Sequence, residues 1–319
     1  MIDPVEQVPF GRTGLNISRL GLGTASITGM FGHEITDADA VQMIHFALDA
    51  GVTLFDTAPH YGPLEAETRL GLALEGVPRE SYVLETKVGR IIQPDGSRVF
   101  DFSYDGIMQS LEGSLKRLKV DAVDSVLLHD PYDFEQQIID ESFPVLAELR
   151  SQGVVKAIGV GIADYALLSR LTAHCDFDVY MQAGHYSLLE QGAQPALELY
   201  ANKRIVVLAA KVFQSGILAT GLHPDARYNY GKTPPHIVDA MMKIEAICAE
   251  YDVPLRAAAL QFVAAHPAVS ALVMGARNTS QLSDTLANLQ VPVSGEFWSA
   301  LKDAEVIPHG APTGIDLET

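Results

Sequence analysis

Four chemically active side chains follow three successive strand-like segments of the 319-residue sequence. Asp56 ends the apolar run VTLFDT, Lys87 ends YVLETK and His129 ends DSVLLH. Tyr61 follows Asp56 by five residues, in the stretch LFDTAPHYGP. Because ionisable groups are costly to bury alone, their repetition at strand ends indicates a shared site. The set is suited to proton transfer coupled to hydride transfer.

Each of the four groups has a role in such chemistry. An ordinary phenol has a pKa of about 10, and an adjacent ammonium stabilises the phenolate, so Lys87 is expected to lower the pKa of Tyr61. Asp56 would keep Lys87 charged and oriented, while His129 would polarise the reacting oxygen or orient the substrate. Taken singly, each residue also has a structural interpretation, because strand-end aspartates often cap turns and tyrosines often pack in loops.

These positions require strands that end at one face. Eight short apolar segments meet the requirement: residues 19–24, 52–57, 82–87, 124–129, 155–160, 179–184, 205–210 and 270–275. They are apolar throughout, as strands buried on both faces must be, and they alternate with helical patterns. The alternation continues without a break in composition. It predicts one (β/α)₈ TIM barrel domain over residues 1–319 rather than a doubly wound sheet, with the active site at the carboxyl ends of the strands.

Helix and turn signals complete the predicted barrel. Thr36 is expected to cap a helix that stops at Gly51. Further helices are predicted at residues 65–75, 103–118, 138–152, 164–172, 190–201, 235–251, 255–265 and 281–289. Residues 8–18 predict a hairpin that turns near Gly11 to Gly14 and plugs the bottom of the barrel. Residues 88–102 and 290–319 are expected to be long loops. Residues 25–34 and 290–310 are expected to shape the substrate pocket.

Composition narrows the range of partners. The net charge is -18, which argues against nucleic acid or an anionic membrane as a partner because both demand clustered Lys and Arg. The N-terminus lacks a basic region followed by an apolar one, and no long apolar run occurs, so we expect a soluble, cytoplasmic protein without a membrane span. Cys175 and Cys248 stand alone, which indicates buried thiols and no metal knuckle. No metal site is predicted, and the oligomeric state is left open.

A hydride requires a carrier, and the sequence offers a phosphate site for one. The run GLGTAS at residues 21–26 lacks the third glycine of a dinucleotide fingerprint. A better phosphate site is FQSGILATG, where Ser215, Gly216, Ile217 and Leu218 offer a hydroxyl and backbone N–H groups. Barrels favour phosphate sites near strands seven and eight. Arg277, in MGARNTSQLSD, would reach an adenosine moiety; its alternative role is that of a solvated charge at a helix start.

These motifs resemble the aldo-keto reductase superfamily over about residues 8 to 308. FDTAPHYG, ETKVGR and LLHDP resemble its tetrad motifs, which implies Asp56, Tyr61, Lys87 and His129 as the catalytic set with Tyr61 as the acid/base. SGILATG and ALQFVAAHPAVSALVMGARNTSQL resemble the branch of aldose 1-dehydrogenases, acting on L-fucose or D-threo-aldoses, and pyridoxal 4-dehydrogenase. The resemblance implies a nicotinamide cofactor, NAD or NADP, and a small sugar or aldehyde as substrate.

The resemblance also assigns the cofactor contacts. It implies that Gln182 holds the nicotinamide carboxamide and that Ser215 to Leu218 hold the pyrophosphate. Residues that would line the remainder of the cofactor are Gly23, Thr24, Asp56, Gly275, Arg277, Gln281 and Asp284. Three departures concern these contacts. Gly161 and Ile162 stand where many members have Ser-Asn, Ala210 replaces a stacking aromatic, and Gly275 replaces an NADP-selective lysine; Lys211 has no assigned role.

The favoured reaction is oxidation of a cyclic aldose at C1 to its lactone by an NAD(P)-dependent oxidoreductase. One alternative is a pyridoxal 4-dehydrogenase or a reductase of aldehydes or ketones, since one tetrad serves both directions. Another is a regulatory barrel that binds cofactor with little turnover. His60, His185, Tyr186 and Trp298 are candidates for the pocket wall or for packing.

Overall fold

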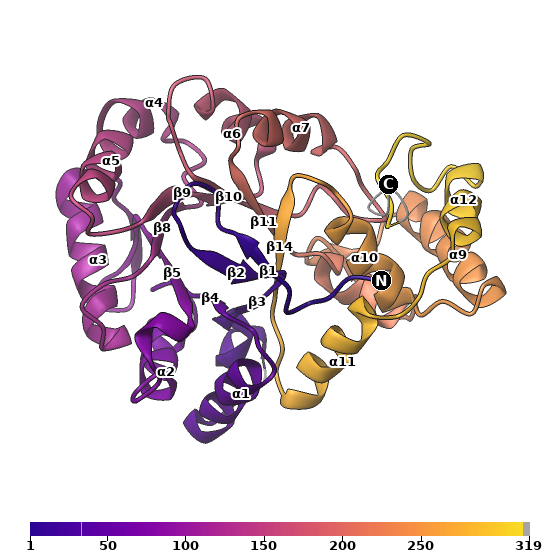
Figure 1. Ribbon diagram of the computed structural model, residues 1–319, viewed down its shortest axis with the longest axis horizontal. Coiled ribbons are helices and arrows are strands. Elements are labelled where there is room, and N and C mark those ends of the chain that lie inside the picture. The colour runs from indigo at the N-terminus through magenta and orange to yellow at the C-terminus, as the bar shows by residue number, and fades with distance from the viewer. Residues whose placement is uncertain (33, 315–319) are drawn as a thin grey trace.

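The computed structural model describes residues 1–32 and 34–314. Within these residues, eight parallel strands close into a barrel in the order β10-β11-β14-β3-β4-β5-β8-β9 (Figure 1). Their bounds are β3 (Leu20–Gly23), β4 (Leu54–Asp56), β5 (Val83–Val88), β8 (Ser125–His129), β9 (Ala157–Ile162), β10 (Val179–Ala183), β11 (Val206–Ala210) and β14 (Val269–Met274). The predicted (β/α)₈ barrel is confirmed. The predicted fifth strand at 155–160 is shifted, because β9 begins two residues later and includes Gly161 and Ile162.

Helices surround the barrel, as the ring in Figure 1 shows. The long ones are α1 (Asp37–Asp49), α2 (Glu65–Ala73), α3 (Tyr104–Leu118), α5 (Phe143–Ser151), α6 (Tyr165–Leu171), α7 (Gln194–Asn202), α9 (Pro235–Glu250), α10 (Leu255–Ala264), α11 (Thr279–Leu289) and α12 (Gly295–Asp303). The Thr36 hydroxyl accepts from the Asp39 N–H, while the Asp39 carboxylate accepts from the Thr36 N–H, so the predicted cap is a full capping box. A single helical turn, α4 (Glu135–Gln137), and a π-helical turn (Ile138–Ser142) precede α5.

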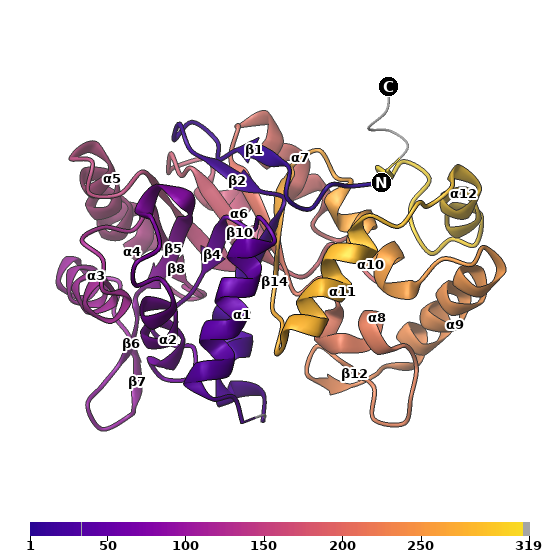
Figure 2. The same cartoon turned by 60° about the horizontal axis from the view of Figure 1, so that its bottom comes forward.

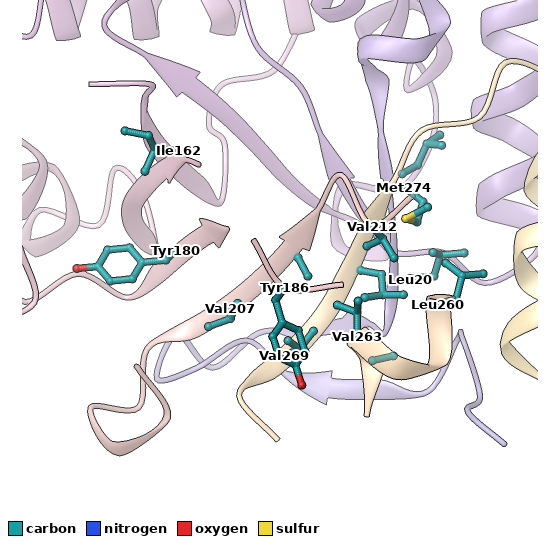
Figure 3. Close-up of a cluster of buried hydrophobic side chains, with 14 of the residues drawn as sticks. Leu20, Ile162, Tyr180, Tyr186, Val207, Val212, Leu260, Val263, Val269 and Met274 are labelled. Carbon is teal, nitrogen blue, oxygen red and sulfur yellow. The ribbon is translucent and has the colours of Figure 1, made fainter. Parts of the chain in front are cut away.

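Two apolar clusters hold the barrel and its helices together. The larger lies between strands and helices; Figure 3 shows part of it, where Leu20, Val207 and Met274 from strands meet Leu260 and Val263 of α10. The smaller fills the inside of the barrel and includes Leu54, Val83, Leu127, Val179 and Leu208. Every second strand residue therefore points inward, which also turns the strand-end polar groups toward the axis.

The N-terminal hairpin closes the bottom of the barrel, as predicted. Strands β1 (Gln7–Pro9) and β2 (Asn16–Ser18) pair antiparallel and lie across the ring of strands in Figure 1. Phe10 and Ile17 are fully buried in the inner cluster. Gly11 has a φ of 59°, and a Cβ there would lie 2.9 Å from Val206 Cγ2, so the turn requires glycine at this point.

Replacement of Phe10 by Ala tests how much this plug contributes to stability. We expect Phe10→Ala to lower the free energy of unfolding by about 3 to 5 kcal/mol, because the fully buried ring leaves a cavity at the base of the barrel. Val99→Ala, at an exposed position, should change it by less than about 0.5 kcal/mol. Urea denaturation of both variants measures the difference, and equal stabilities would contradict the plug.

Three predicted segments differ from the structure. Residues 88–102 contain a hairpin, β6 (Arg90–Ile92) and β7 (Arg98–Phe100), where a loop was expected. The tail contains α12, which Ser294 caps and which buries Phe297, Trp298 and Leu301; residues 315–319 of the predicted loop lie outside the described residues, as does residue 33. The helix predicted at 190–201 begins at Gln194, because Ser187 and Glu190 form a bridge before it.

Several short elements lie at the face of the barrel where the strands have their carboxyl ends. Residues 24–27 and 29–31 form 3₁₀ turns in the predicted loop 25–34. A third such turn, Arg79–Ser81, lies at the opposite face because it leads into the start of β5. After β11 come a 3₁₀ turn (Gln214–Gly216), α8 (Ile217–Thr220) and a small hairpin of β12 (Arg227–Tyr228) and β13 (Gly231–Lys232). Figure 2 places β6–β7 and β12 at the end opposite the β1–β2 hairpin. None of the described helices is long and apolar enough to cross a membrane.

Candidate active site

The predicted tetrad residues meet at the carboxyl ends of β4, β5 and β8. Lys87 Nζ forms an ion pair with the Asp56 carboxylate and donates to the Thr57 carbonyl oxygen at 3.1 Å. The same ammonium lies 4.8 Å from the centre of the Tyr61 ring. The His129 ring stands nearly perpendicular to the Tyr61 ring, with centres 5.7 Å apart. Four groups from three strand ends therefore converge on one point.

Lys87 is held as a charged ammonium in a buried place. Its side chain is 1% exposed, and that of Asp56 is 4% exposed. Burial opposes the charge on Lys87, but the Asp56 carboxylate, together with Tyr61 and Glu85 in their ionised forms, outweighs it and raises the pKa of the ammonium. An uncompensated buried charge would be unstable, so the pair with Asp56 is what allows a lysine at this position.

The Tyr61 phenol is less acidic than the sequence predicts. Burial raises its pKa to about 12, and the charge of Lys87 opposes this shift without overcoming it. The predicted contribution of Lys87 has the expected sign, but the predicted net lowering of the pKa is wrong because desolvation is the larger effect. The neutral phenol is therefore the resting form, which makes Tyr61 a proton donor in reduction and a strong base once deprotonated.

His129 is a neutral imidazole beside the phenol. Burial, together with the charges of Lys87, Arg90 and His60, holds its pKa well below the ordinary value. Its Nδ1 is buried and has no hydrogen-bond partner among the described residues, while Nε2 lies 3.8 Å from an Asp130 oxygen. A neutral imidazole can donate to a substrate oxygen without adding a second cation next to Lys87.

A network that the sequence interpretation missed supports His129. Arg90 donates to Asp130 at 2.6 Å and to His60 Nε2 at 2.8 Å. Burial and the charges of Arg90 and Arg98 lower the pKa of His60 to about 4, so His60 accepts from Arg90 as a neutral ring. Arg90 belongs to the quoted motif ETKVGR, and Asp130 directly follows His129, so their places after two strand ends were the available signal.

Gln182 is suited to the carboxamide of a nicotinamide. Its amide nitrogen donates to the Ala163 and Gly184 carbonyl oxygens at 3.0 and 3.2 Å. Its Oε1 is buried and receives no hydrogen bond from any described residue. An unpaired buried acceptor is costly, and the amide N–H of a nicotinamide would satisfy it. The residue thus fits the cofactor that the resemblance implies.

Two glycines, Gly23 at the end of β3 and Gly275 directly after β14, occupy closely packed positions. A Cβ at Gly23 would lie 3.2 Å from Val273 Cγ1, and one at Gly275 would lie 2.9 Å from Ser26 Oγ. Thr24 donates from its hydroxyl to the Asp56 carbonyl oxygen at 2.9 Å, which ties the end of β3 to the tetrad. Gly23 and Thr24 therefore lie beside Asp56, and Gly275 lies near Gly23 on the other side of β3.

The predicted phosphate loop has an unusual backbone. Gln214, Ser215 and Gly216 have positive φ values of 46°, 59° and 100°. The N–H groups of Gly216 and Leu218 donate to the Phe213 carbonyl oxygen at 2.9 and 3.2 Å, and Ile217 donates to Gln214. The Ser215 hydroxyl accepts from the Tyr230 N–H at 2.8 Å. The loop is therefore held by its own bonds, and its binding of pyrophosphate stays a prediction.

The residues predicted to contact the adenosine end lie just before α11 and within it. The Arg277 N–H donates to Gln281 Oε1 at 3.0 Å. Asn278 caps the helix by accepting from the Gln281 N–H at 2.9 Å. Asp284 forms an ion pair with Arg256 of α10. Arg277 and Gln281 thus lie together at the start of α11, while Asp284 already has a cation as its partner.

The first two departures from the family pattern lie at the ends of β9 and β11. Gly161 lies in β9 next to Lys87, and a Cβ there would be in ordinary van der Waals contact with Lys87 Cε at 3.5 Å. Ile162 is the last residue of β9 and is buried. Ala210 is half-buried at the end of β11, and Lys211 follows with a φ of 57° and its Nζ 5.4 Å from the Tyr230 ring centre.

The four candidate wall residues divide between the site and the core. His60 contacts His129, with ring centres 5.8 Å apart. Tyr186 is buried against Phe262 and His266, and Trp298 is buried against Phe262 and Phe297, so both pack in the core. His185 lies 3.2 Å from a Glu190 oxygen. Within the described ranges, no group of three or more His, Cys, Asp or Glu is placed to hold a metal.

The fold and this tetrad define a class of barrel oxidoreductases. The sequence matches the aldo/keto reductase family over residues 19–306, and the chain belongs to that family. It is 36% identical to a D-threo-aldose 1-dehydrogenase from a Pseudomonas species, covering 92% of this chain and 96% of that protein. It is 32% identical to a pyridoxal 4-dehydrogenase from Microbacterium luteolum, covering 95% and 98%. The chain is therefore an NAD(P)-dependent oxidoreductase.

Solved structures agree with the barrel. An aldo-keto reductase from Bacillus halodurans, solved in its holo form, superposes with a TM-score of 0.81 at 23% sequence identity. The match covers 94% of this chain and 96% of that one. At this identity the likeness concerns the fold.

Proposed function

We propose that the protein oxidises a cyclic aldose at its anomeric carbon to the lactone, with NAD or NADP as hydride acceptor. The observation that carries the proposal is the buried Lys87 ammonium, paired with Asp56 and lying 4.8 Å from the Tyr61 ring centre. The similarity to a D-threo-aldose 1-dehydrogenase supports an aldose as substrate.

Each side chain of the site has a separate role in this reaction. Tyr61, as phenolate, accepts the proton of the C1 hydroxyl, while Lys87 stabilises the phenolate and neutral His129 orients the substrate oxygen. A nicotinamide, when bound, would supply the acceptor for the hydride of C1, so that C1 becomes the carbonyl carbon of the lactone. Gln182 would hold the carboxamide of the nicotinamide, and Arg277 with Gln281 would lie at the adenosine end.

A substrate panel tests the proposal. L-fucose, D-threo-aldoses, pyridoxal and small aldehydes are offered with each nucleotide in both directions, and nicotinamide absorbance measures turnover. We expect the highest kcat/KM for an aldose with an oxidised nucleotide. The second candidate, a pyridoxal 4-dehydrogenase, is favoured by the relative that is 32% identical, and a higher kcat/KM for pyridoxal would replace the first. Nucleotide binding without turnover of any compound would indicate the regulatory barrel instead.

The rate of oxidation is expected to depend on pH. Since burial raises the pKa of Tyr61 to about 12, the phenolate is a small fraction near neutral pH and grows as pH rises. We expect kcat for oxidation to increase about tenfold per pH unit between about pH 6 and about pH 8, while reduction changes little there because the phenol stays protonated. A C1-deuterated aldose shows whether hydride transfer limits the rate. A flat oxidation profile with a full isotope effect would contradict the role of Tyr61.

Nucleotide choice is expected to depend on Arg277. Gly275 provides no charge at the turn after β14, so we expect NAD to bind at least as well as NADP. A charge-assisted bond from Arg277 to a 2′-phosphate is worth about 1.5 to 3 kcal/mol, so Arg277→Ala should weaken NADP binding about ten- to a hundredfold and NAD binding less. Titration calorimetry gives both dissociation constants. A wild-type preference for NADP beyond about tenfold, or equal losses in the variant, would count against the assignment.

A further inference from the structure

Glu85 is a buried acid within the barrel, next to the tetrad. It has no exposed surface, and it is the cross-strand neighbour of Asp56 on β4 and of Ser125 on β8. It precedes Lys87 by two residues on β5, so the two side chains point to the same side of the strand. Glu85 therefore lies inside the barrel, one layer closer to its amino end than the reacting groups.

The hydrogen bonds of Glu85 leave one oxygen without a donor. Ser125 Oγ donates to Glu85 Oε2 at 2.7 Å, whereas Oε1 is buried and has no partner among the described residues if Glu85 is ionised. A buried carboxylate oxygen without a donor is costly. A protonated Oε1 would instead be a donor, and the acceptor is the Asp56 carboxylate, which is on the next strand with its side chain within hydrogen-bonding reach of Glu85.

The balance of charge also favours a protonated Glu85. Two carboxyl groups, Asp56 and Glu85, share one ammonium, Lys87, in a place without solvent. Burial raises the pKa of Asp56 as well, but Asp56 is the acid that pairs directly with Lys87, and this contact opposes the shift and favours its ionised form over that of Glu85. Burial and the charge of Asp56 raise the pKa of Glu85 to about 8, with Lys87 and Ser125 acting in the opposite direction. The inner cluster around this layer, which includes Leu54, Val83 and Leu127, is apolar.

We propose that Glu85 is a positioning residue that acts through Asp56 and Lys87. Protonated, it donates a hydrogen bond to Asp56 and leaves the Asp56–Lys87 pair neutral overall. When it ionises, a second negative charge competes for Lys87 and disfavours the Tyr61 phenolate. Glu85 is thus protonated in the resting site. Loss of this proton at alkaline pH limits the rise in the fraction of Tyr61 that is phenolate. The catalytic consequence depends on the proposed function, whereas the protonated state does not.

Infrared spectroscopy of the protein without substrate tests the protonated state. We expect the carbonyl band of a buried carboxylic acid near neutral pH, lost with a midpoint near pH 8 and absent from Glu85→Gln. Ser125→Ala, which removes a donor to the carboxylate form, should move the midpoint to higher pH. The matched control is Glu67→Gln. Glu67 is equally buried but ion-paired with Arg117 at 2.7 Å, so its replacement should leave the band unchanged.

The pH profile of oxidation tests the catalytic consequence. We expect wild type to bend near pH 8 while Glu85→Gln continues to rise, exceeding wild type by up to about tenfold, because each unit added to the pKa of Tyr61 removes about nine-tenths of the phenolate. Absence of the band at neutral pH, an unmoved midpoint in Ser125→Ala, or superimposable profiles would overturn the inference. A Glu85 band in a protein that oxidises no aldose would instead reject the proposed function and leave the protonated acid established.

Discussion

Tyr61→Phe is expected to reduce kcat about 10²- to 10⁴-fold in either direction, because it removes the group that exchanges a proton with the substrate oxygen. The ring remains, so its contacts with Lys87 and His129 should persist and nucleotide binding should change little. Steady-state kinetics measure kcat, and fluorescence titration with NAD and NADP measures binding.

The matched control for this prediction is Tyr104→Phe. Tyr104 is the first residue of α3 and is 52% exposed, so the loss of its hydroxyl should leave turnover within about twofold of wild type. If Tyr61→Phe retains near wild-type turnover, Tyr61 is not the acid/base. If it loses nucleotide binding as well as turnover, the variant has disturbed the site and Lys87 must be tested separately.

The barrel was predictable because its strands carry a strong local signal. Runs such as VTLFDT and DSVLLH are apolar throughout, which suits strands buried on both faces. The β6–β7 hairpin was missed because its residues do not alternate: Val99 and Phe100 are both exposed in the folded protein. Helix α12 was missed because Pro292 and the glycines near it indicate a loop, whereas Ser294 caps a helix that Phe297 and Trp298 anchor in the core. Tertiary packing determines the secondary structure of both segments.

The positions of the tetrad residues were predictable from the sequence, but the pKa of Tyr61 was not. Asp56 and His129 end their strands and Lys87 is the second-to-last residue of β5, so parallel topology alone brings them together. The balance between desolvation and charge at Tyr61 depends on how deeply the phenol is buried, and no residue pattern gives that depth. Glu85 had a signal, since residues two apart on a strand share a side, but its effect requires the partners Asp56 and Ser125 on neighbouring strands.

Lys87→Met is expected to reduce kcat by at least about a hundredfold, because the phenolate of Tyr61 loses the cation that stabilises it. Unlike Tyr61→Phe, it should also lower the free energy of unfolding, by about 3 to 5 kcal/mol, since it leaves the buried Asp56 carboxylate without a counter-charge. Urea denaturation and steady-state kinetics measure the two effects.

A double variant separates these two roles of Lys87. Asp56→Asn combined with Lys87→Met removes both charges of the buried pair, so it should recover most of the lost stability, because replacing a whole buried pair costs far less than breaking it. It should recover no turnover, because the cation beside Tyr61 is still missing. Recovery of both properties would mean that Lys87 serves only to neutralise Asp56. Recovery of stability alone would assign to Lys87 a separate effect on the phenol, acting over the 4.8 Å between Nζ and the ring centre.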